Sequence, residues 1–413
     1  MKDLRNTLIN LASFGITSLL GLYLYFLLVK NGNESTLGVF NFQYIFIVII
    51  SQLSTFGVHY SVLKESSNKE YSKNLQFNNF LSGVLIVFLI SLLLGLLLFL
   101  LKDFISTYLN FKIDKIIIPA IFFSINKCCY WFLNGKEKFA KMAFLSPIRF
   151  LTFLLTYLSI LENNSLQELL YLCFLYGEIL VFFLALFFLY PEIKMSFDIK
   201  SFLNFITIHY AFSKKAFLTS FLSDLNLKID ILLIGILLGT QSVGYYTFTS
   251  AIGEGLIGLI TATRTMSTPK YAILINEKAK FNSFKKSIFK ITYSLFLPIG
   301  LFILIFTHIF SNYFSFLIQI SDNGMFSLIV IVIGFSLISY CFAFEHILLQ
   351  INYPKEHTKS LLLLFISNLS LNLVLINLYG INGAAVATIM SYIIYFFQIN
   401  KKLRKFTKLS FLI

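Results

Sequence analysis

Runs of about 20 apolar residues recur along the whole chain, and each is long enough to cross about 30 Å of hydrocarbon as a helix. Hydrophobic residues make up 57% of the 413 positions and charged residues only 13%, which is far from the balance of a water-soluble domain. The sequence lacks the segments of about 10 residues with alternating polarity that are typical of an outer-membrane barrel. We therefore predict an all-α protein that crosses the membrane many times.

The lengths of the apolar runs and the positions of the polar loops between them predict twelve transmembrane helices. These are residues 8–29, 40–62, 79–101, 115–133, 142–161, 168–190, 215–238, 244–268, 286–310, 324–350, 359–378 and 382–400. Six of them precede the long interruption at 191–214 and six follow it. We therefore expect two six-helix lobes, 1–190 and 215–413. Because apolar residues recur at helical spacing in 191–214, this linker is predicted to be an amphipathic helix on the cytoplasmic surface.

Basic residues are concentrated in alternate loops. The intervening loops hold only Lys30, Lys102, Lys112 and Lys115. By the positive-inside rule, the basic loops, both termini and the basic tail that follows the last span are cytoplasmic. The net charge of +14 therefore reflects membrane topology, and we expect no nucleic-acid partner.

Several motifs resemble those of the bacterial oligosaccharide flippases, the polysaccharide and O-antigen flippases of the multidrug/oligosaccharidyl-lipid/polysaccharide exporter superfamily. Asp230 with the apolar run after it, Gly239, Val243–Tyr246 and Pro269 resemble the family's seventh and eighth spans. The other similar motifs are Leu37–Phe40, Asn134–Lys136 with Phe139 and Ala140, and Tyr379–Ala387. Together these motifs extend over nearly the whole chain.

This resemblance implies a translocase of the bacterial inner (cytoplasmic) membrane. Such a protein moves an undecaprenyl-pyrophosphate-linked oligosaccharide to the periplasmic leaflet, for O-antigen or another surface polysaccharide. It works by alternating access of two six-helix lobes around a central cavity and is driven by an ion gradient. The implied partners are the lipid-linked oligosaccharide and the lipid bilayer, with other membrane proteins of polysaccharide assembly left open. No cofactor is implied.

Charged residues inside the apolar spans are functional candidates, because a charge in hydrocarbon is costly. The basic candidates for binding the anionic headgroup are Lys127, Arg149, Lys228 and Arg264. The acidic candidates for ion coupling are Asp224, Asp230, Glu178, Glu254 and Glu345. Glu254 is the favoured coupling acid, since Gly253 and Gly255 beside it allow a neighbouring helix to approach closely.

Each charge also has a purely structural interpretation. Asp224 and Lys228 are spaced as an i,i+4 pair, which either neutralises itself or releases the lysine for an anionic headgroup when the aspartate is protonated. Lys127 and Arg149 are predicted to lie at a similar depth. They either reach toward water or form a cationic floor for a pyrophosphate. Arg264 lies near the end of its span, where an interfacial anchor is the favoured interpretation.

The sequence argues against other classes of protein. It has no G-x-x-x-x-G-K-[ST] loop, so we expect no ATPase within the chain. The longest outside loop, 102–115, has neither paired carboxylates nor a D-x-D motif, which argues against an enzyme. The four cysteines have no metal-ligand spacing, so no metal site is predicted. The main alternative is an ion-coupled multidrug exporter of the same superfamily, in which acids should dominate the cavity and bind cations. The counts of acidic and basic candidates in the spans do not decide between the two, but four basic residues suit an anionic lipid-linked substrate better.

Overall fold

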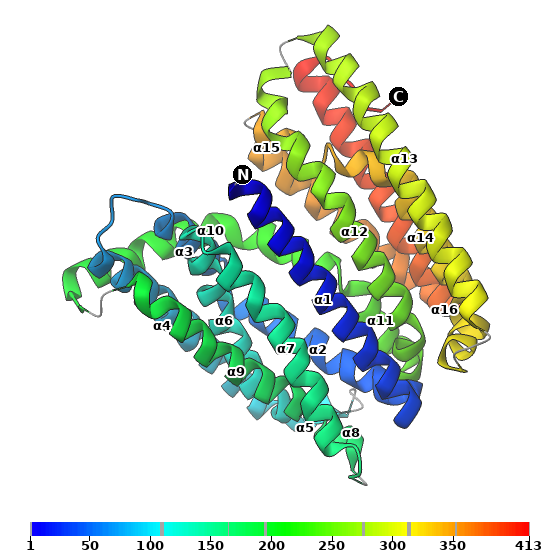
Figure 1. Cartoon of the computed structure of the whole chain (residues 1–413), viewed down its shortest axis with the longest axis horizontal. Coiled ribbons are helices and arrows are strands. Elements are labelled where there is room, and N and C mark those ends of the chain that lie inside the picture. The colour runs from blue at the N-terminus through cyan, green and yellow to red at the C-terminus, as the bar shows by residue number, and fades with distance from the viewer. Residues whose placement is uncertain are drawn as a thin grey trace. The chain divides into compact units, whose positions relative to one another are not determined.

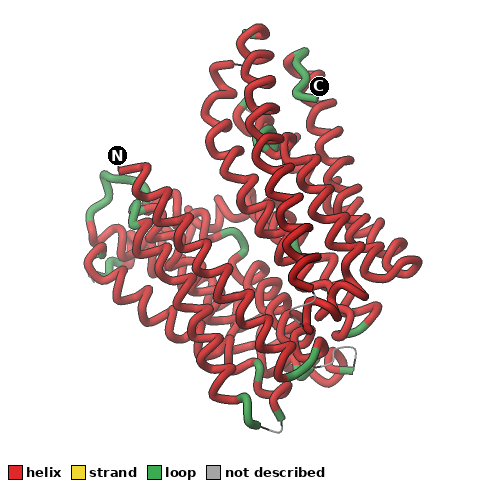
Figure 2. Tube along the Cα trace, turned by 45° about the vertical axis from the view of Figure 1, so that its right-hand side comes forward, coloured by secondary structure: helices red, strands yellow, loops and turns green. Residues whose placement is uncertain are grey.

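The computed structural model describes residues 2–107, 111–163, 165–193, 196–274, 277–311, 315–351 and 353–412. Within them, it does not describe the side chains of 2–8, 10–11, 262–274, 310–311 and 315–323. In these described ranges all regular elements are helices, and Figure 2 shows no strand among them. The predicted all-α class is confirmed.

Residues 1–224 form one compact unit, unit 1 (Figure 1). Its elements are α1 (Lys2–Asn31), α2 (Glu34–Thr55), α3 (Val58–Ser66), α4 (Lys73–Leu100), α5 (Lys102–Ser106), η1 (Ile113–Ile116), α6 (Ile117–Gly135), α7 (Phe139–Ile160), α8 (Leu166–Leu169), α9 (Tyr171–Leu189), η2 (Tyr190–Glu192) and nearly all of α10 (Ile199–Asn226).

Residues 225–413 form a second compact unit, unit 2. Its elements are α11 (Ile229–Leu238), α12 (Thr240–Leu274), α13 (Lys278–Ser311), α14 (Ser315–Phe342), α15 (Ile347–Gln350) and α16 (Pro354–Thr407).

Nine stretches of the described chain are helical, long and apolar enough to cross a membrane. The multi-pass architecture is therefore confirmed, with differences in detail. One stretch, α16, contains the last two predicted spans, because the helix is broken at Gly380 by φ 58° and ψ −140°. The predicted span 215–238 is divided between α10 and α11 by a turn at Leu227 and Lys228.

The predicted span 40–62 is also broken, between α2 and α3. Phe56 and Gly57 both adopt left-handed backbone conformations, with φ 46° and 79°. At Gly57 a Cβ atom would lie 3.3 Å from the backbone nitrogen of Phe217 in α10. The Phe56 ring stacks on the Phe217 ring at 4.5 Å between centroids. The break therefore lets α10 pack closely against this part of unit 1.

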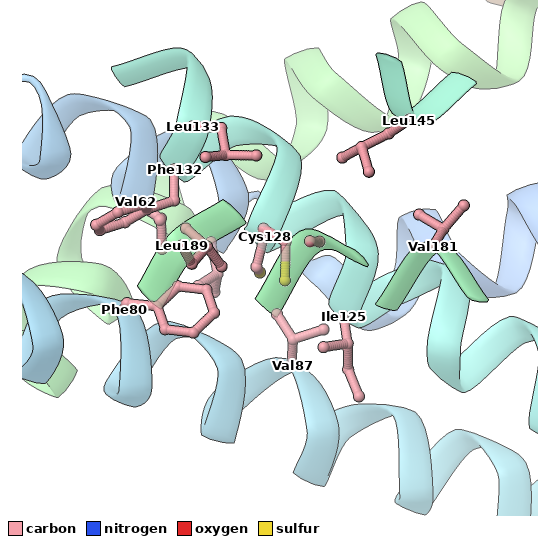
Figure 3. Close-up of a cluster of buried hydrophobic side chains, with 13 residues drawn as sticks. Val62, Phe80, Val87, Ile125, Cys128, Phe132, Leu133, Leu145, Val181 and Leu189 are labelled. Carbon is pink, nitrogen blue, oxygen red and sulfur yellow. The ribbon is translucent and has the colours of Figure 1, made fainter. Parts of the chain in front are cut away.

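Helix α6 is the centre of unit 1, packing against α2, α3, α4 and α9. Its buried face carries Ile125, Cys128 and Phe132, which pack with Val62 of α3 and Phe80 of α4 (Figure 3). Burying such side chains stabilises the fold by about 1.5–3 kcal/mol each. This apolar packing fixes the orientation of α6 within unit 1.

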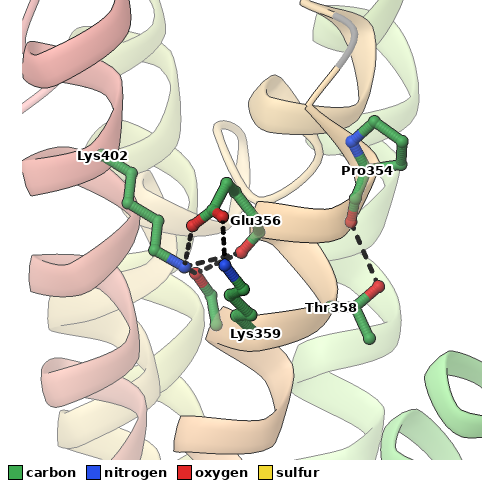
Figure 4. Close-up of polar contacts among 6 residues, drawn as sticks. Pro354, Glu356, Thr358, Lys359 and Lys402 are labelled. Carbon is green, nitrogen blue, oxygen red and sulfur yellow. Dashed lines mark hydrogen bonds and ion pairs between the residues drawn. The ribbon is translucent and has the colours of Figure 1, made fainter.

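Helix α14 has the equivalent place in unit 2, packing against α12, α13 and α16. The two halves of α16 are tied together near their far ends. The Lys402 Nζ atom lies 3.1 Å from Glu356 Oε2 and donates to the Ser360 hydroxyl at 3.0 Å (Figure 4). The break at Gly380 and this polar tie make α16 a helical hairpin.

Helix α10 runs without interruption through residue 215, where the linker was expected to end and the second lobe to begin. Its buried side includes Phe202, Phe205 and His209. The His209 ring nitrogens lie 2.8 Å from the Ser61 hydroxyl oxygen and 3.1 Å from the Asn79 carbonyl oxygen. This segment is therefore anchored to α3 and α4 by polar contacts, which the apolar periodicity of the linker did not indicate.

The helix begins after Asp198, whose carboxylate accepts a hydrogen bond from the Ser201 backbone N–H at 3.0 Å. The Ser201 hydroxyl also donates to this carboxylate. Together these hydrogen bonds hold the pKa of Asp198 below its usual value, because they favour the charged carboxylate. The first turn of α10 is capped in this way.

Candidate functional site

Unit 1 contains a buried ion pair between α7 and α9. Arg149 Nε lies 2.7 Å from Glu178 Oε1, and Arg149 Nη2 donates to Glu178 Oε2 at 3.2 Å. Asn126 of α6 donates to the same Oε2 atom at 2.9 Å. Only 1% of the Glu178 side chain is exposed. Removing either partner of a pair buried this deeply would leave an uncompensated charge in the protein interior.

The two basic candidates of unit 1 meet at one aromatic ring. The Arg149 guanidinium carbon lies 4.9 Å from the centroid of the Phe123 ring, and the Lys127 Nζ atom lies 5.6 Å from the same centroid. Both contacts fall within the range of cation–π attraction. Phe123 and Lys127 are one turn apart on α6, so the helix itself aligns them. The structure therefore brings together Lys127 and Arg149, which the sequence predicted at similar depth.

Lys127 is held by groups from two other helices. Its Nζ atom donates to Gln52 Oε1 of α2 at 2.7 Å and lies 3.7 Å from Asp224 Oδ2 of α10. The Gln52 amide in turn donates to the Ser220 hydroxyl at 2.5 Å. The side chains of Lys127 and Asp224 are 18% and 38% exposed. Unlike the Arg149 pair, this ion pair is long and accessible on the aspartate side.

Asp224 and Lys228 were expected to be an i,i+4 pair on one helix. The regular helix instead ends at Asn226, and Lys228 lies in the turn that precedes α11. Lys228 Nζ lies 2.5 Å from Glu254 Oε1 of α12, whereas Asp224 lies against Lys127. The continuous helix on which the expected pair depends is interrupted by the turn at 227–228.

The Lys228–Glu254 pair joins the turn before α11 to α12 in unit 2, and it is partly open. Its side chains are 17% and 38% exposed, and the Ser250 hydroxyl also donates to Glu254 at 3.3 Å. Close by, the Tyr246 hydroxyl donates to Asp230 Oδ2 at 2.8 Å. Gly239, with φ 87°, makes the turn between α11 and α12 that places these side chains near one another.

Asp230, Tyr246 and Glu254 line a cavity of about 30 Å³ in unit 2, together with Thr388 and Tyr392. A cavity of this size has room for one or two water molecules. Its lining combines carboxylates with hydroxyl groups, which are suitable ligands for a water chain or a hard cation. The site therefore has the chemistry for holding a proton or a small cation.

Uncharged polar residues make contacts that the search for intramembrane charges missed. Asn368 Nδ2 donates to Asn226 Oδ1 at 3.1 Å, and Asn372 Nδ2 donates to Asn368 Oδ1 at 2.7 Å. Gln52 and Asn126 have similar roles in unit 1. The i,i+4 spacing of Asn368 and Asn372 within an apolar run was the available signal, because buried amides in such runs need partners.

Two of the predicted site residues, Glu345 and Arg264, take part in none of the contacts described above. Glu345 lies in the turn between α14 and α15 and is half-buried. Arg264 belongs to α12, but its side chain lies outside the described residues. Its predicted role as a headgroup ligand or interfacial anchor stays a prediction.

Comparison with known proteins supports a flippase-like or exporter-like fold. A family described as "Polysaccharide biosynthesis protein" matches residues 33–313. Among solved structures, the chain is similar to the lipid II flippase MurJ in an inward closed conformation, with a TM-score of 0.77 and 18% identity over 96% of this chain and 87% of that one.

The chain is also similar to a MATE transporter of Vibrio cholerae, with a TM-score of 0.66 and 15% identity over 98% of this chain and 97% of that one. A MATE family multidrug transporter in an inward-facing conformation gives a TM-score of 0.68 and 13% identity over 95% and 96% of the two chains. No match was found among curated protein sequences. At these identities the structural likeness establishes the fold alone.

Proposed function

Because the chain belongs to the polysaccharide biosynthesis protein family, we propose that it is a flippase for lipid-linked oligosaccharides. Its substrate is an undecaprenyl-pyrophosphate-linked repeat unit of O-antigen or another surface polysaccharide. It moves this substrate across the bacterial inner membrane by alternating access. In this proposal the protein is a transporter and not an enzyme, and its termini lie in the cytoplasm.

The observation that carries this proposal is the open Lys127–Asp224 pair beside Arg149. Lys127 is held in place by Gln52, yet its carboxylate partner is 3.7 Å away and partly exposed. A pyrophosphate oxygen can replace that carboxylate on the lysine, because both ligands are anionic oxygen acceptors. Arg149 also contacts the Phe123 ring and adds positive potential near Lys127. The site therefore suits an anionic headgroup.

Lys228 is proposed as a second headgroup contact, in unit 2. Its partner Glu254 is partly exposed, so protonation or cation binding at Glu254 would release the lysine. We assign the coupling role to Glu254 and Asp230, which line the small polar cavity. Glu178 is better suited to holding Arg149 than to coupling, because it is already committed to a buried pair.

The proposal is tested by replacing Lys127 with alanine. In cells whose own gene is deleted, Lys127→Ala should lower surface polysaccharide about tenfold or more, equivalent to about 1.4 kcal/mol or more of lost headgroup binding. Lipid-linked repeat units should accumulate in the cytoplasmic leaflet. Lys115→Ala is the matched control, since Lys115 pairs with Glu168 away from this cluster, and it should leave export unchanged.

The opposite result would point to another substrate. If gene deletion leaves surface polysaccharide intact and no lipid-linked repeat units accumulate, the flippase proposal is wrong. Increased sensitivity of the deletion strain to cationic drugs would instead favour the multidrug exporter. Full export with Lys127→Ala at normal protein levels would remove Lys127 from the headgroup site.

A further inference from the structure

Lys127 and Trp131 lie on the same face of α6. They are four residues apart, which in a helix places them about 6 Å apart along the axis and nearly above one another. Ile125, Cys128 and Phe132 lie about 100° or more around the helix from Lys127 and are buried in the core of unit 1 (Figure 3). The core packing therefore fixes the direction in which both Lys127 and Trp131 project.

Trp131 is part of an aromatic group with two residues of α3. The Trp131 ring lies 4.9 Å from the Tyr60 ring and 5.9 Å from the His59 ring, between centroids. Tyr60 is brought here by the left-handed break at Phe56 and Gly57, directly before α3. Trp131 and Tyr60 are both half-buried, whereas His59 is buried. The group thus has an accessible part, formed by Tyr60 and Trp131.

Hydrogen-bonding groups surround this aromatic pair. The Tyr60 side chain lies near Ser220 and within electrostatic range of Asp224. The Ser220 hydroxyl accepts a hydrogen bond from Gln52, which in turn accepts one from Lys127. A half-buried aromatic surface therefore lies near the Asp224 carboxylate, whose side chain is 38% exposed.

We propose that Tyr60 and Trp131 form a carbohydrate-binding platform in unit 1, which binds a pyranose ring of the lipid-linked oligosaccharide beside the Lys127 headgroup site. A pyranose has a face of C–H groups that packs on the electron-rich face of an aromatic ring. Its hydroxyl groups lie at the rim, where Asp224 can accept their hydrogen bonds. This inference rests on the proposed function and deepens it.

The one-turn spacing on α6 matches the chemistry of the substrate. In a lipid-linked oligosaccharide the first sugar is bonded directly to the pyrophosphate. A phosphate on Lys127 therefore places that sugar about one helical turn away, within reach of Trp131. Aromatic residues also anchor helices at membrane interfaces, but an interfacial anchor would show no preference for a lipid that carries a sugar.

Trp131 is the only tryptophan of the chain, so intrinsic fluorescence reports on this position alone. The experiment uses the full-length protein in lipid nanodiscs with two probes, undecaprenyl pyrophosphate and the same lipid carrying one N-acetylglucosamine. The sugar-bearing lipid should shift the tryptophan emission, whereas the bare lipid should leave it nearly unchanged. In competition with radiolabelled lipid, the sugar-bearing probe should bind about three- to tenfold more tightly, the range expected for aromatic stacking.

Variants separate a sugar contact from a structural role. Trp131→Leu and Tyr60→Leu should abolish the preference for the sugar-bearing lipid and leave the affinity for bare undecaprenyl pyrophosphate unchanged. Trp131→Phe should retain part of the preference, because it keeps an aromatic ring. Tyr130→Leu is the matched control, since the adjacent Tyr130 interacts with Ser146 instead, and it should keep the full preference.

Three results would overturn the platform. If both Leu variants keep the full preference, the sugar is bound elsewhere. If the wild-type protein binds both probes equally with no change in emission, the platform is wrong while headgroup binding stands. If neither lipid binds, the proposed flippase function fails as well, so the two failures are distinguishable.

Discussion

Two charged pairs, Arg149–Glu178 in unit 1 and Lys228–Glu254 in unit 2, are held in different ways. In unit 1, Arg149 and Glu178 are enclosed by α6, α7 and α9, and Asn126 satisfies a further carboxylate contact. In unit 2, Lys228 and Glu254 form a pair that is partly open, next to a small polar cavity. An enclosed pair is expensive to break, whereas an open pair can exchange its partner. We therefore expect the accessibility of a pair, and not its short distance, to separate a structural role from a functional one.

This comparison is tested most severely by Glu178→Gln in unit 1. The substitution leaves the Arg149 charge buried without its counter-charge, so it should destabilise the protein by about 3 kcal/mol, the lower end of the range for a broken buried pair. The glutamine amide still offers one acceptor to the guanidinium, which is why the lower end is expected. The measurement is the melting temperature and the yield of the purified protein in detergent.

The double variant Arg149→Met with Glu178→Leu is the control for this prediction. Replacing a buried ion pair by apolar residues of similar volume is often neutral or stabilising, so the double variant should melt close to the wild type. If Glu178→Gln alone were as stable as the wild type, the Arg149–Glu178 pair would be accessible to water, and the contrast between the two pairs would disappear.

A smaller effect is expected at the backbone break of unit 2. Gly380 has φ 58° and ψ −140°, a conformation that is essentially restricted to glycine, so Gly380→Ala should destabilise the protein by about 1–3 kcal/mol. The cost comes from the backbone alone, because the nearest atom to an added Cβ is Leu238 Cδ1, at 4.0 Å.

Gly255 provides the matched control in the same unit. It lies within α12, and an added Cβ would have nothing within 4 Å, so Gly255→Ala should stabilise the helix by about 0.5–1 kcal/mol. Thermal unfolding of both variants gives the comparison. Equal melting temperatures for the two variants would contradict a required break at Gly380.

The smallest stability change is expected for Glu254→Gln, the counterpart of Glu178→Gln in unit 2. Because the pair with Lys228 is partly open to solvent, its loss should change stability by less than about 1 kcal/mol. Transport should nevertheless lose its dependence on the ion gradient, since glutamine can neither be protonated nor carry the charge that holds Lys228.

Transport into vesicles with and without an imposed ion gradient measures this dependence. Glu277→Gln is the control, because Glu277 pairs with Lys280 at an exposed position, and gradient dependence should be retained. If Glu254→Gln instead lowered the melting temperature as much as Glu178→Gln, the pair in unit 2 would be structural too. Retained gradient dependence in Glu254→Gln would assign coupling to another acid, with Asp230 the next to test.

The sequence was most informative about features that depend on local patterns. Apolar length predicted the membrane-spanning helices, including a break between 378 and 382 that the structure places at Gly380. It was less informative where a span is interrupted inside an apolar run. The break at Phe56 and Gly57 depends on the close approach of α10. The contact residue, Phe217, is 160 positions from Gly57, so the hydropathy around Gly57 cannot indicate it.

Charge partners show the same limit. The i,i+4 rule predicted Asp224 with Lys228, because sequence spacing describes contacts within one helix. The structure places Asp224 at Lys127 and Lys228 at Glu254, each across two helices. Asn126, Gln52 and Tyr246 were missed for a related reason. Their roles follow from the buried charge that each one meets, and that partner is set by helix packing.

By itself, the sequence determined that this is an all-α, multi-pass membrane protein with basic and acidic groups inside its spans. The hydrophobicity of a segment, and the free-energy cost of placing a charge in hydrocarbon, depend on that segment's own residues. Both can therefore be inferred from the sequence. Only the tertiary structure decided which charges are enclosed, as Arg149 and Glu178 are, and which stay open, as Lys127 and Asp224 do. That distinction depends on which helices pack together, since burial and partners are contributed by distant parts of the chain.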